Sequence, residues 1–264
     1  MAELDGLWVD EEYARAFTLE HAHYEEDLAL WRQLARSLGS PVLDLGAATG
    51  RVAIALARDG AEVIALDGSE PMVAELHRAL AAEPAAVAGR VHPVVADLRD
   101  FAQEPPVPLA IMAMNTLQAL VGPADQLACL RAARAALRDD GELWFDVAFP
   151  DLAEIQGSIG VVRLGEVHHD GASGAVLQHA AWYDDFDPVT QTLEFTLQVD
   201  RSDDAGTVRR VLRHHRVHLF MPAELGHLLA RAGLRVLDRY GDFGGGPVTG
   251  ESERQVYRCG RMGA

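Results

Sequence analysis

The sequence predicts an α/β fold with a largely parallel sheet, into which a segment of antiparallel strands is inserted. From Pro41 onward, short β-branched or apolar runs alternate with helical stretches rich in alanine, leucine and arginine, which is typical of consecutive βαβ units. After Pro150 the pattern changes to strand-like runs separated by Asp-Gly and Asp-Pro turns, which are typical of antiparallel hairpins. No repeat of fixed period is visible, which argues against a solenoid or a propeller.

The first forty residues are expected to form helices. Residues 10–38 are amphipathic, with aromatic side chains among acidic ones, and predict one or two helices that pack on the sheet domain and could form a lid. The strands of the parallel sheet are expected at residues 41–45, 62–66, 91–95, 109–114 and 142–147. Helix start and stop signals place helices between them at residues 52–58, from Ser69 and Pro71 onward, and at 123–138.

The antiparallel insertion and the end of the chain complete this organisation. Strand-like runs after Pro150 are expected at residues 161–167, 175–183, 192–199 and 207–220. The α/β pattern then resumes with a helix at 222–233, a strand at 234–240, a glycine-rich loop and a last strand at 255–259. The sequence therefore predicts a helical lid over 1–40, a main α/β domain over 41–150 and 221–264, and an insertion over 151–220 that forms a substrate roof or a dimer contact.

Composition excludes several classes of protein. No apolar stretch reaches the roughly 18 residues of a spanning helix, and the start of the sequence lacks a basic and then apolar leader, so a soluble cytoplasmic protein is expected. The formal charge of −17 disfavours a nucleic-acid substrate. All 23 basic residues are arginine, which excludes a phosphate-loop lysine and pyridoxal chemistry. Two cysteines, Cys129 and Cys259, are too few for a disulfide framework.

The segment from Val42 to Arg51 is an apolar strand that turns through a small-residue loop into a helix. Glycines at positions 46 and 50 would let the backbone approach a ligand closely. A dinucleotide site would have glycine at the first, third and sixth places of this loop, which here hold Gly46, Ala48 and Arg51, so a nicotinamide cofactor is disfavoured. By itself the loop is also compatible with a plain strand-to-helix turn.

Two acidic residues end the next two expected strands. Asp67 lies about 20 residues beyond the loop, the spacing expected of a carboxylate that accepts both ribose hydroxyls. Asp97 ends the following strand, where it could accept a hydrogen bond from an adenine amino group while Leu98 and Met72 sandwich the ring. Either acid alone could be an ordinary helix cap. Together with the loop they predict a ligand of the adenosine type.

These residues resemble the class I S-adenosylmethionine-dependent methyltransferase family, whose first motif is similar to Val42–Gly50 and whose next two acidic positions match Asp67 and Asp97. The resemblance implies a Rossmann-like seven-stranded mixed sheet of order 3-2-1-4-5-7-6, with helices on both faces and the antiparallel insertion after strand 5. It implies S-adenosyl-L-methionine as the cofactor and S-adenosyl-L-homocysteine as the product. The sequence departs from the family's commonest loop at Ala48, where glycine is usual, and at Ala47, where cysteine is frequent.

The resemblance also implies roles for individual residues. Asp44 would steady the loop, Gly46 and Ala47 would face the methionine part, and Asn115 would lie near the sulfonium. The full set expected to bind the cofactor is Tyr13, Asp44, Gly46, Ala47, Ala48, Gly50, Asp67, Gly68, Ser69, Met72, Ala96, Asp97, Leu98, Met114, Asn115 and Gln118.

Methyl transfer from a sulfonium is an in-line displacement, so alignment of the acceptor and exclusion of water are the enzyme's main tasks. The candidate catalytic residues are Tyr13, Tyr24 and Asn115, although an aromatic residue on an amphipathic helix more often belongs to a core. The place of the insertion and the ending Gly241-Asp-Phe-Gly-Gly-Gly-Pro are most similar to bacterial small-molecule N-methyltransferases, including those acting on amino sugars of natural products. The expected acceptor is a nitrogen or an oxygen of a small molecule.

No metal site is expected. His21 and His23 are two residues apart and would point to different faces of a helix. His214, His215 and His218 lie on or beside an expected strand, and a solvated sheet face is favoured for them over a metal site.

Two other functions stay open at this point. One is an NAD-dependent oxidoreductase on a related dinucleotide-binding domain, and the other is a catalytically silent methyltransferase-like protein that acts by binding a partner. A small-molecule acceptor is expected, with no nucleic acid and no membrane as partners, in a monomer or a homodimer. The sequence does not identify the acceptor.

Overall fold

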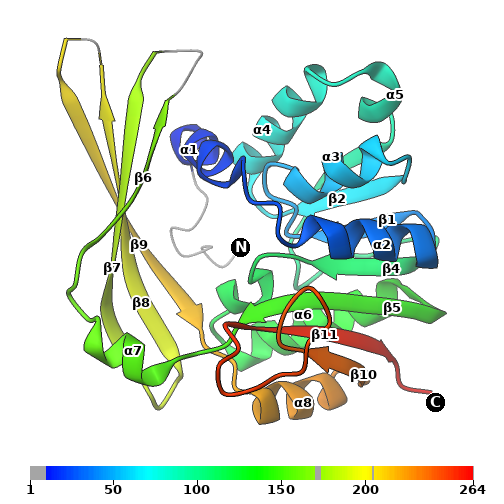
Figure 1. Ribbon diagram of the computed structural model, residues 1–264. Coiled ribbons are helices and arrows are strands. Elements are labelled where there is room, and N and C mark those ends of the chain that lie inside the picture. Colours follow the sequence, from blue (N-terminus) through cyan, green and yellow to red (C-terminus); the bar gives the residue numbers. More distant parts are fainter. Residues whose placement is uncertain (1–9, 170–173, 204, 264) are drawn as a thin grey trace.

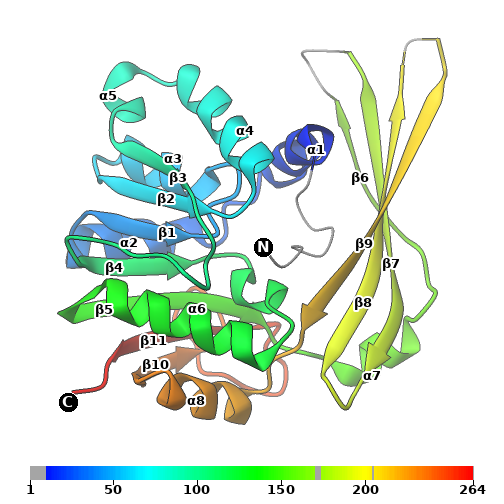
Figure 2. The same cartoon turned by 180° about the vertical axis from the view of Figure 1, so that it is seen from behind.

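The computed structural model describes residues 10–169, 174–203 and 205–263 and contains two sheets (Figure 1). The larger sheet has seven strands and the smaller sheet has four. Both views in Figures 1 and 2 place the smaller sheet beyond the edge at which the parallel strands of the larger sheet end.

The seven-stranded sheet has the order β10-β11-β5-β4-β1-β2-β3. Strands β1 to β5 are parallel to one another, and β11 runs antiparallel between β5 and β10. This is the expected Rossmann-like order 3-2-1-4-5-7-6, which is thereby confirmed. The strands are β1 (Val42–Leu45), β2 (Val63–Asp67), β3 (Val91–Val95), β4 (Val107–Met112), β5 (Leu137–Ala148), β10 (Leu234–Tyr240) and β11 (Arg254–Arg261).

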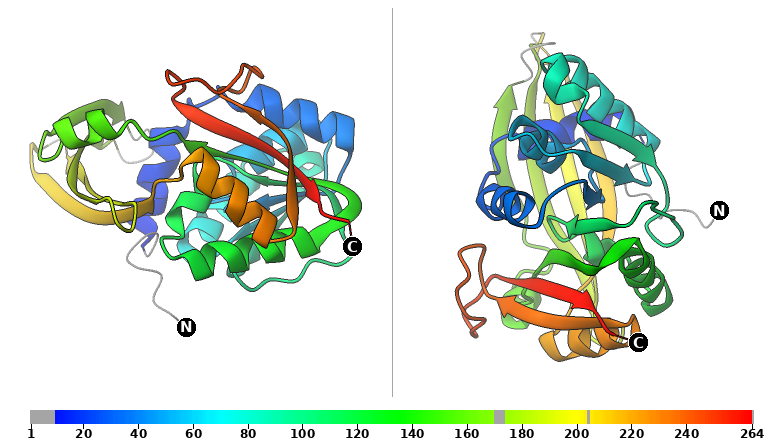
Figure 3. Two further views of the ribbon diagram at one scale, coloured as in Figure 1. Left: turned by 90° about the horizontal axis from the view of Figure 1, so that it is seen from below. Right: turned by 90° about the vertical axis from the view of Figure 1, so that its right-hand side faces the viewer.

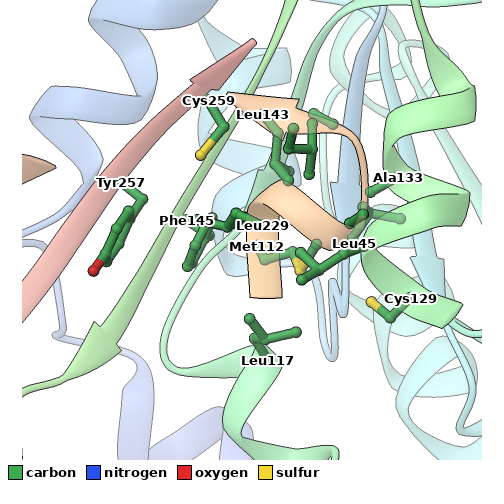
Figure 4. Close-up of a cluster of buried hydrophobic side chains, with 14 of the residues drawn as sticks. Leu45, Met112, Leu117, Cys129, Ala133, Leu143, Phe145, Leu229, Tyr257 and Cys259 are labelled. Atoms are coloured by element: carbon green, nitrogen blue, oxygen red, sulfur yellow. The ribbon is translucent and has the colours of Figure 1, made fainter. Parts of the chain in front are cut away.

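Helices cover both faces of this sheet (Figure 3), which explains why every residue of β1 and β4 is buried. Residues of α2, α3 and α4 form one core with Val42 and Val63, and residues of α6 and α8 form the other with Leu45 and Phe145. Figure 4 shows the second core, where Phe145 stacks on Tyr257 with ring centroids 5.0 Å apart. The helices are α1 (Glu11–His21), α2 (Leu28–Leu38), α3 (Arg51–Arg58), α4 (Glu70–Ala81), α5 (Ala85–Ala88), α6 (Pro123–Ala136), α7 (Leu152–Gly157) and α8 (Pro222–Arg231), with a 3-10 turn η1 (Thr116–Ala119).

The boundary between α6 and β5 differs from the sequence prediction. The helix ends at Ala136 rather than at Arg138, and β5 begins at Leu137 rather than at Glu142. Leu137 pairs with Val107 of β4, a contact between residues that are distant in the sequence. At Gly141 the chain passes so close to β4 that a Cβ atom would lie 2.8 Å from the carbonyl oxygen of Val107. Strand pairing therefore overrides the local helical pattern here.

The four-stranded sheet is formed by the insertion and has the order β6-β7-β8-β9, with every pair antiparallel. Its strands are β6 (Arg163–His169), β7 (Val176–Asp187), β8 (Thr192–Ser202) and β9 (Val208–His218). β7 and β8 each extend three to four residues beyond the predicted ends because they pair with each other along their whole length. We call this sheet the roof.

Gln118 joins both ends of the insertion to the main domain. Its Oε1 accepts a hydrogen bond from the N–H of Ala148, where β5 leads into the insertion, at 2.9 Å. Its Nε2 donates to the carbonyl oxygen of His218, where β9 leaves the roof, also at 2.9 Å. Because Gln118 is buried, these two bonds fix the roof relative to η1.

Helix α1 lies between the roof and the main domain, as Figure 3 shows. It is linked to β9 by ion pairs between Asp10 and Arg213, at 2.6 Å, and between Glu12 and Arg209, at 3.2 Å. Glu11 approaches Arg78 of α4 at 3.7 Å on the other side. α1 therefore contacts both the roof and the main domain.

The expectation of a solvated histidine face on β9 is wrong for two of its three residues. His214 is exposed, but His215 is buried against Phe195 with ring centroids 5.0 Å apart. His218 is buried because the strand leaves the roof there and its ring packs against Phe220, while its Nε2 lies 2.8 Å from Glu224 Oε1. Among the residues that the structure describes, no group of three or more His, Cys, Asp or Glu side chains is arranged to hold a metal ion.

Both cysteines are buried thiols. Within the described ranges, no helix has both the length and the apolar composition needed to cross a membrane.

Replacing Gln118 by alanine should loosen the roof. The substitution leaves the buried carbonyl oxygen of His218 and the half-buried N–H of Ala148 without their side-chain partner. We therefore expect a loss of about 3 kcal/mol in the free energy of unfolding and faster cleavage by trypsin within residues 149–220. Urea unfolding and limited proteolysis measure the two effects. Gln126→Ala is the matched control, because the Gln126 amide is equally buried but bonds to Leu120, outside the roof. Equal cleavage rates in the two variants would show that Gln118 does not hold the roof.

Candidate functional site

The ends of β1, β2 and β3 meet at one edge of the large sheet. The N–H groups of Gly46 and Ala47 donate to the carbonyl oxygen of Leu66 at 2.8 and 3.0 Å. The N–H of Ala48 donates to Asp67 Oδ2 at 2.8 Å, and the N–H of Ala96 donates to the backbone oxygen of Asp67 at 3.0 Å. The structure thus brings the loop after β1, Asp67 and the segment that carries Asp97 together.

The loop after β1 has a backbone that glycine favours. Gly46, Ala48 and Gly50 have φ values of +76°, +48° and +90°. A Cβ atom on Gly46 would lie 2.5 Å from Cγ2 of Thr116, so a side chain there has no room. Ala48 adopts a left-handed φ at the position where the related family usually has glycine, which gives a physical reason for that preference. The loop is therefore closely packed, and neither Gly46 nor Gly50 has room for a side chain.

Asp67 holds the loop and keeps capacity for a ligand. Its Oδ1 accepts from the N–H of Ser69 at 2.8 Å, while Oδ2 accepts from the N–H of Ala48. Burial raises the pKa of this carboxyl, and the two backbone hydrogen bonds oppose that shift. Each carboxylate oxygen accepts up to two hydrogen bonds, and each oxygen of Asp67 accepts one from the described residues, which leaves a second position on each for a sugar hydroxyl.

Asp97 has a partner that the sequence analysis missed. Arg99 Nη2 lies 2.6 Å from Asp97 Oδ2, and Arg99 Nε lies 2.9 Å from Asp97 Oδ1. The Arg99 guanidinium, which also reaches Asp125 at 3.1 Å, lowers the pKa of the Asp97 carboxyl. Asp97 is consequently an ionised acceptor in a fixed orientation, at the place where an adenine amino group is expected. Arg99 follows Asp97 by two residues in the sequence, but this spacing alone does not predict an ion pair.

Asp44 lies fully buried behind the loop. Burial raises the pKa of its carboxyl to about 7, with Arg51 opposing the shift and Asp67 and Asp27 adding to it. Its Oδ2 has no hydrogen-bond donor among the described residues. A buried carboxylate oxygen of this kind fits a ligand that carries a positive charge, such as the methionine end of S-adenosylmethionine.

Arg51 ties the start of α3 to α2. Its guanidinium forms two hydrogen bonds to Asp27, at 2.7 and 2.6 Å, and a third to the backbone oxygen of Tyr24 at 2.9 Å. It also lies over the ring of Tyr24, 4.9 Å from the centroid. Asp27 is fully buried and in addition accepts from Trp31 Nε1 at 2.8 Å. The sequence analysis missed this pair, since Arg51 stood out only as the residue that replaces a glycine of the dinucleotide pattern.

The two candidate tyrosines occupy different places. Tyr13 on α1 is buried between Arg213, 4.7 Å from the ring centroid, and the ring of His215 at 6.0 Å. Tyr24 lies in the turn between α1 and α2, and burial raises its pKa to about 12. Burial is also the main reason why the pKa of Tyr13 is raised. At neutral pH both side chains are therefore uncharged hydroxyls.

The remaining candidates are distributed along the same edge. Met72 is only 1% exposed because Tyr13 and Ala14 of α1 cover it. Asn115 is exposed at the end of β4, in a turn with a left-handed backbone. Gln118 is occupied by its bonds to the insertion. Gly50, Gly68, Ser69, Ala96, Leu98 and Met114 lie in the loops that follow β1, β2, β3 and β4.

Replacing Asp44 by asparagine should stabilise the ligand-free protein in a pH-dependent way. The folded-state pKa is raised to about 7 from 3.8, so the folded state holds the proton longer than the unfolded state and stability falls as the pH rises through this range. An asparagine does not ionise, and the advantage of Asp44→Asn should grow by about 2 kcal/mol between pH 5.5 and pH 8, as measured by urea unfolding.

Asp200→Asn is the control for the general effect of removing one negative charge from an acidic protein. Arg210 lowers the pKa of the Asp200 carboxyl, so this substitution should destabilise the protein at both pH values. A pH-independent difference between wild type and Asp44→Asn would contradict the assignment for Asp44.

Comparison with known proteins agrees with this geometry. Residues 42–141 match the family model described as a methyltransferase domain. The chain is 27% identical over 232 residues to a cypemycin N-terminal methyltransferase from a Streptomyces species, covering 87% of this chain and 86% of that protein. The structure of the CcbJ methyltransferase from Streptomyces caelestis is 29% identical, with a TM-score of 0.71 over 89% of this chain and 95% of that one. The glycopeptide N-methyltransferase MtfA in complex with S-adenosylmethionine, which is 21% identical, shares the fold, with a TM-score of 0.60 over 90% of this chain and 88% of that one.

These matches and the edge built by the loop, Asp67 and Asp97 lead to one conclusion about the chain and its cofactor. The chain contains a methyltransferase domain over residues 42–141 and is an S-adenosylmethionine-dependent methyltransferase.

Proposed function

We propose that the chain transfers the methyl group of S-adenosylmethionine to a neutral amine nitrogen of a small molecule or of a peptide terminus. The observation that carries the proposal is the convergence of the loop after β1, Asp67 and Asp97 at one edge of the sheet, with Asn115 following the adjacent strand. The relative that acts on an N-terminus supports a nitrogen acceptor.

S-adenosylmethionine supplies a methyl group that is already activated by the sulfonium, so the chain needs no nucleophile of its own. The residues of the site act by binding, by orientation and by exclusion of water. We assign Asp67 to the ribose, Asp97 to the adenine, and Asp44 with the loop after β1 to the methionine part. Asn115 is the candidate closest to the acceptor.

The side chains around Tyr13 favour an amine over a hydroxyl acceptor. An alcohol or phenol would require a base to remove its proton. Burial lowers the pKa of His215 to about 4, so its imidazole is neutral and a weak base, and Tyr13 keeps its proton for the same physical reason. An amine that enters in its neutral form needs only alignment, which these groups can provide.

We also assign a separate role to each of three parts of the chain. Residues 1–40 act as a lid, residues 41–150 and 221–264 bind the cofactor, and residues 151–220 form a roof over the acceptor. The cover that α1 places over Met72 supports the lid, because α1 must move for a ligand to reach that side chain. The cytoplasmic location and the choice between monomer and homodimer stay predictions from the sequence.

Replacing Asp67 by alanine should weaken cofactor binding. We expect the dissociation constant for S-adenosylhomocysteine, measured by calorimetry, to rise by about 100-fold, because hydrogen bonds to a charged acceptor are lost together with the anchor of the loop. Asp59→Ala, at the opposite end of α3, is the control and should bind like wild type. Wild-type protein that responds to NAD but not to S-adenosylhomocysteine would instead select the oxidoreductase alternative.

The nature of the acceptor can be tested with matched pairs of compounds. We expect transfer of label from methyl-labelled S-adenosylmethionine to a peptide with a free N-terminus or to an amino sugar, and none to the N-acetylated forms. The value of kcat/KM should rise with pH up to the pKa of the acceptor amine, because only the neutral amine attacks. Labelling of the acetylated amino sugar would identify a hydroxyl as the acceptor. Cofactor binding without transfer to any acceptor would favour a catalytically silent protein.

A further inference from the structure

The turn that follows β4 has an unusual backbone for its residues. Met114 and Asn115 adopt φ values of +52° and +63°, so two consecutive residues other than glycine are left-handed. Such conformations are unfavourable for side chains with a Cβ atom and persist only where surrounding contacts hold them. The turn carries Asn115 at the edge of the sheet where the cofactor and the acceptor meet.

Besides hydrogen bonds within the turn, one contact that holds it comes from β5. Asp146 is fully buried, and its Oδ1 accepts a hydrogen bond from the N–H of Met114 at 2.8 Å. Its Oδ2 accepts from Arg254 Nη1, at the start of β11, at 2.9 Å. A buried carboxylate requires partners of this kind, and the two bonds fix the direction of the carboxylate plane. The position of Asn115 therefore depends on Asp146 and Arg254.

Arg254 is itself fixed by the glycine-rich loop between β10 and β11. Its guanidinium lies over the ring of Phe243, 4.4 Å from the centroid. The ring of Phe243 contacts Trp31 of α2 edge-on, with centroids 6.0 Å apart. The glycine-rich loop therefore positions Arg254, and Arg254 in turn orients Asp146.

We propose that Asp146, oriented by Arg254, is a positioning residue for methyl transfer. It sets the left-handed turn at Met114 and Asn115 and thereby the line along which the acceptor nitrogen approaches the methyl group. Asp146 is buried behind the turn and does not touch the acceptor. The inference rests on the proposed amine methylation, and its effect is on alignment rather than on cofactor affinity.

The same two strands contain a second buried acid–arginine pair that serves as a comparison. Glu142 on β5 and Arg258 on β11 form hydrogen bonds of 2.6 and 3.0 Å. In the register of these strands Val256 lies opposite Asp146 and Gly260 lies opposite Glu142, so the Glu142 pair is at the other end of the sheet, away from the site. Removing either acid removes a similar interaction from the fold, but only Asp146 contacts the turn.

The test compares Asp146→Ala, Asp146→Asn and Glu142→Ala with wild type. Three measurements are made: Tm, the backbone amide resonance of Met114 in ligand-free protein labelled with [15N]methionine, and kcat with the amine acceptor. We expect Asp146→Ala to shift the Met114 amide and to reduce kcat by 10- to 100-fold, with the dissociation constant for S-adenosylhomocysteine within threefold of wild type. Asp146→Asn retains an acceptor for the Met114 N–H but loses the acceptor for Arg254, so its kcat and its Met114 amide resonance should lie between those of wild type and Asp146→Ala. Glu142→Ala should lower Tm and leave both the amide resonance and kcat unchanged.

Several outcomes would overturn the proposal. Equal losses of kcat and Tm in Asp146→Ala and Glu142→Ala would mean that both pairs serve stability alone. An unchanged Met114 amide resonance or an unchanged kcat in Asp146→Ala would also overturn the proposal. If Asp146→Ala does not fold, Arg254→Met provides the comparison, because it leaves Asp146 without its orienting partner. A wild-type protein that methylates no amine would refute the proposed function instead, and the amide shift would still decide whether Asp146 sets the turn.

Discussion

The hydrogen bond from the N–H of Ala48 to the carboxylate of Asp67 is the interaction on which the site depends. It forms because β1 and β2 are parallel neighbours in which Leu45, the last residue of β1, pairs with Leu66, so that Asp67 at the end of β2 lies beside the loop. The loop after β1 can therefore fold back on the acid that ends β2. The second oxygen of Asp67 accepts from Ser69 at the start of α4, so one carboxylate orients two loops. These two hydrogen bonds to Asp67 determine how the loops after β1 and β2 lie relative to each other.

Buried charge is concentrated at this end of the sheet. Asp44 has a buried oxygen without a donor in the described part of the chain, and burial raises its pKa to about 7. Asp146 resembles it, since burial raises its pKa to about 6 although Arg254 opposes the shift. Carboxyl groups in such surroundings destabilise a ligand-free fold when they ionise, and active sites commonly retain groups that lower stability. A cationic ligand would relieve this cost at Asp44.

The four-stranded sheet, α1 and the main domain are joined by ion pairs and hydrogen bonds. Residues on the inner face of β9 hold α1 through Arg209 and Arg213, while Gln118 attaches both ends of the insertion to the turn that carries Asn115. The four-stranded sheet and the turn that carries Asn115 are thus connected through Gln118. Tyr13 and His215 are buried between these parts and are uncharged, because burial disfavours their ionised forms. Such an environment suits an acceptor that arrives as a neutral amine.

The sequence by itself determined the succession of strands and helices along the chain, the loop after β1, and the acids at the end of β2 and shortly after β3. These features follow from local periodicity, glycine positions and short spacings. Tertiary structure decided the rest. The start of β5 at Leu137 depends on pairing with Val107, and the burial of His215 depends on packing in the roof. The contact between Arg254 and Asp146 joins residues 108 positions apart. No local pattern encodes such a contact, since it exists only once β11 has inserted beside β5.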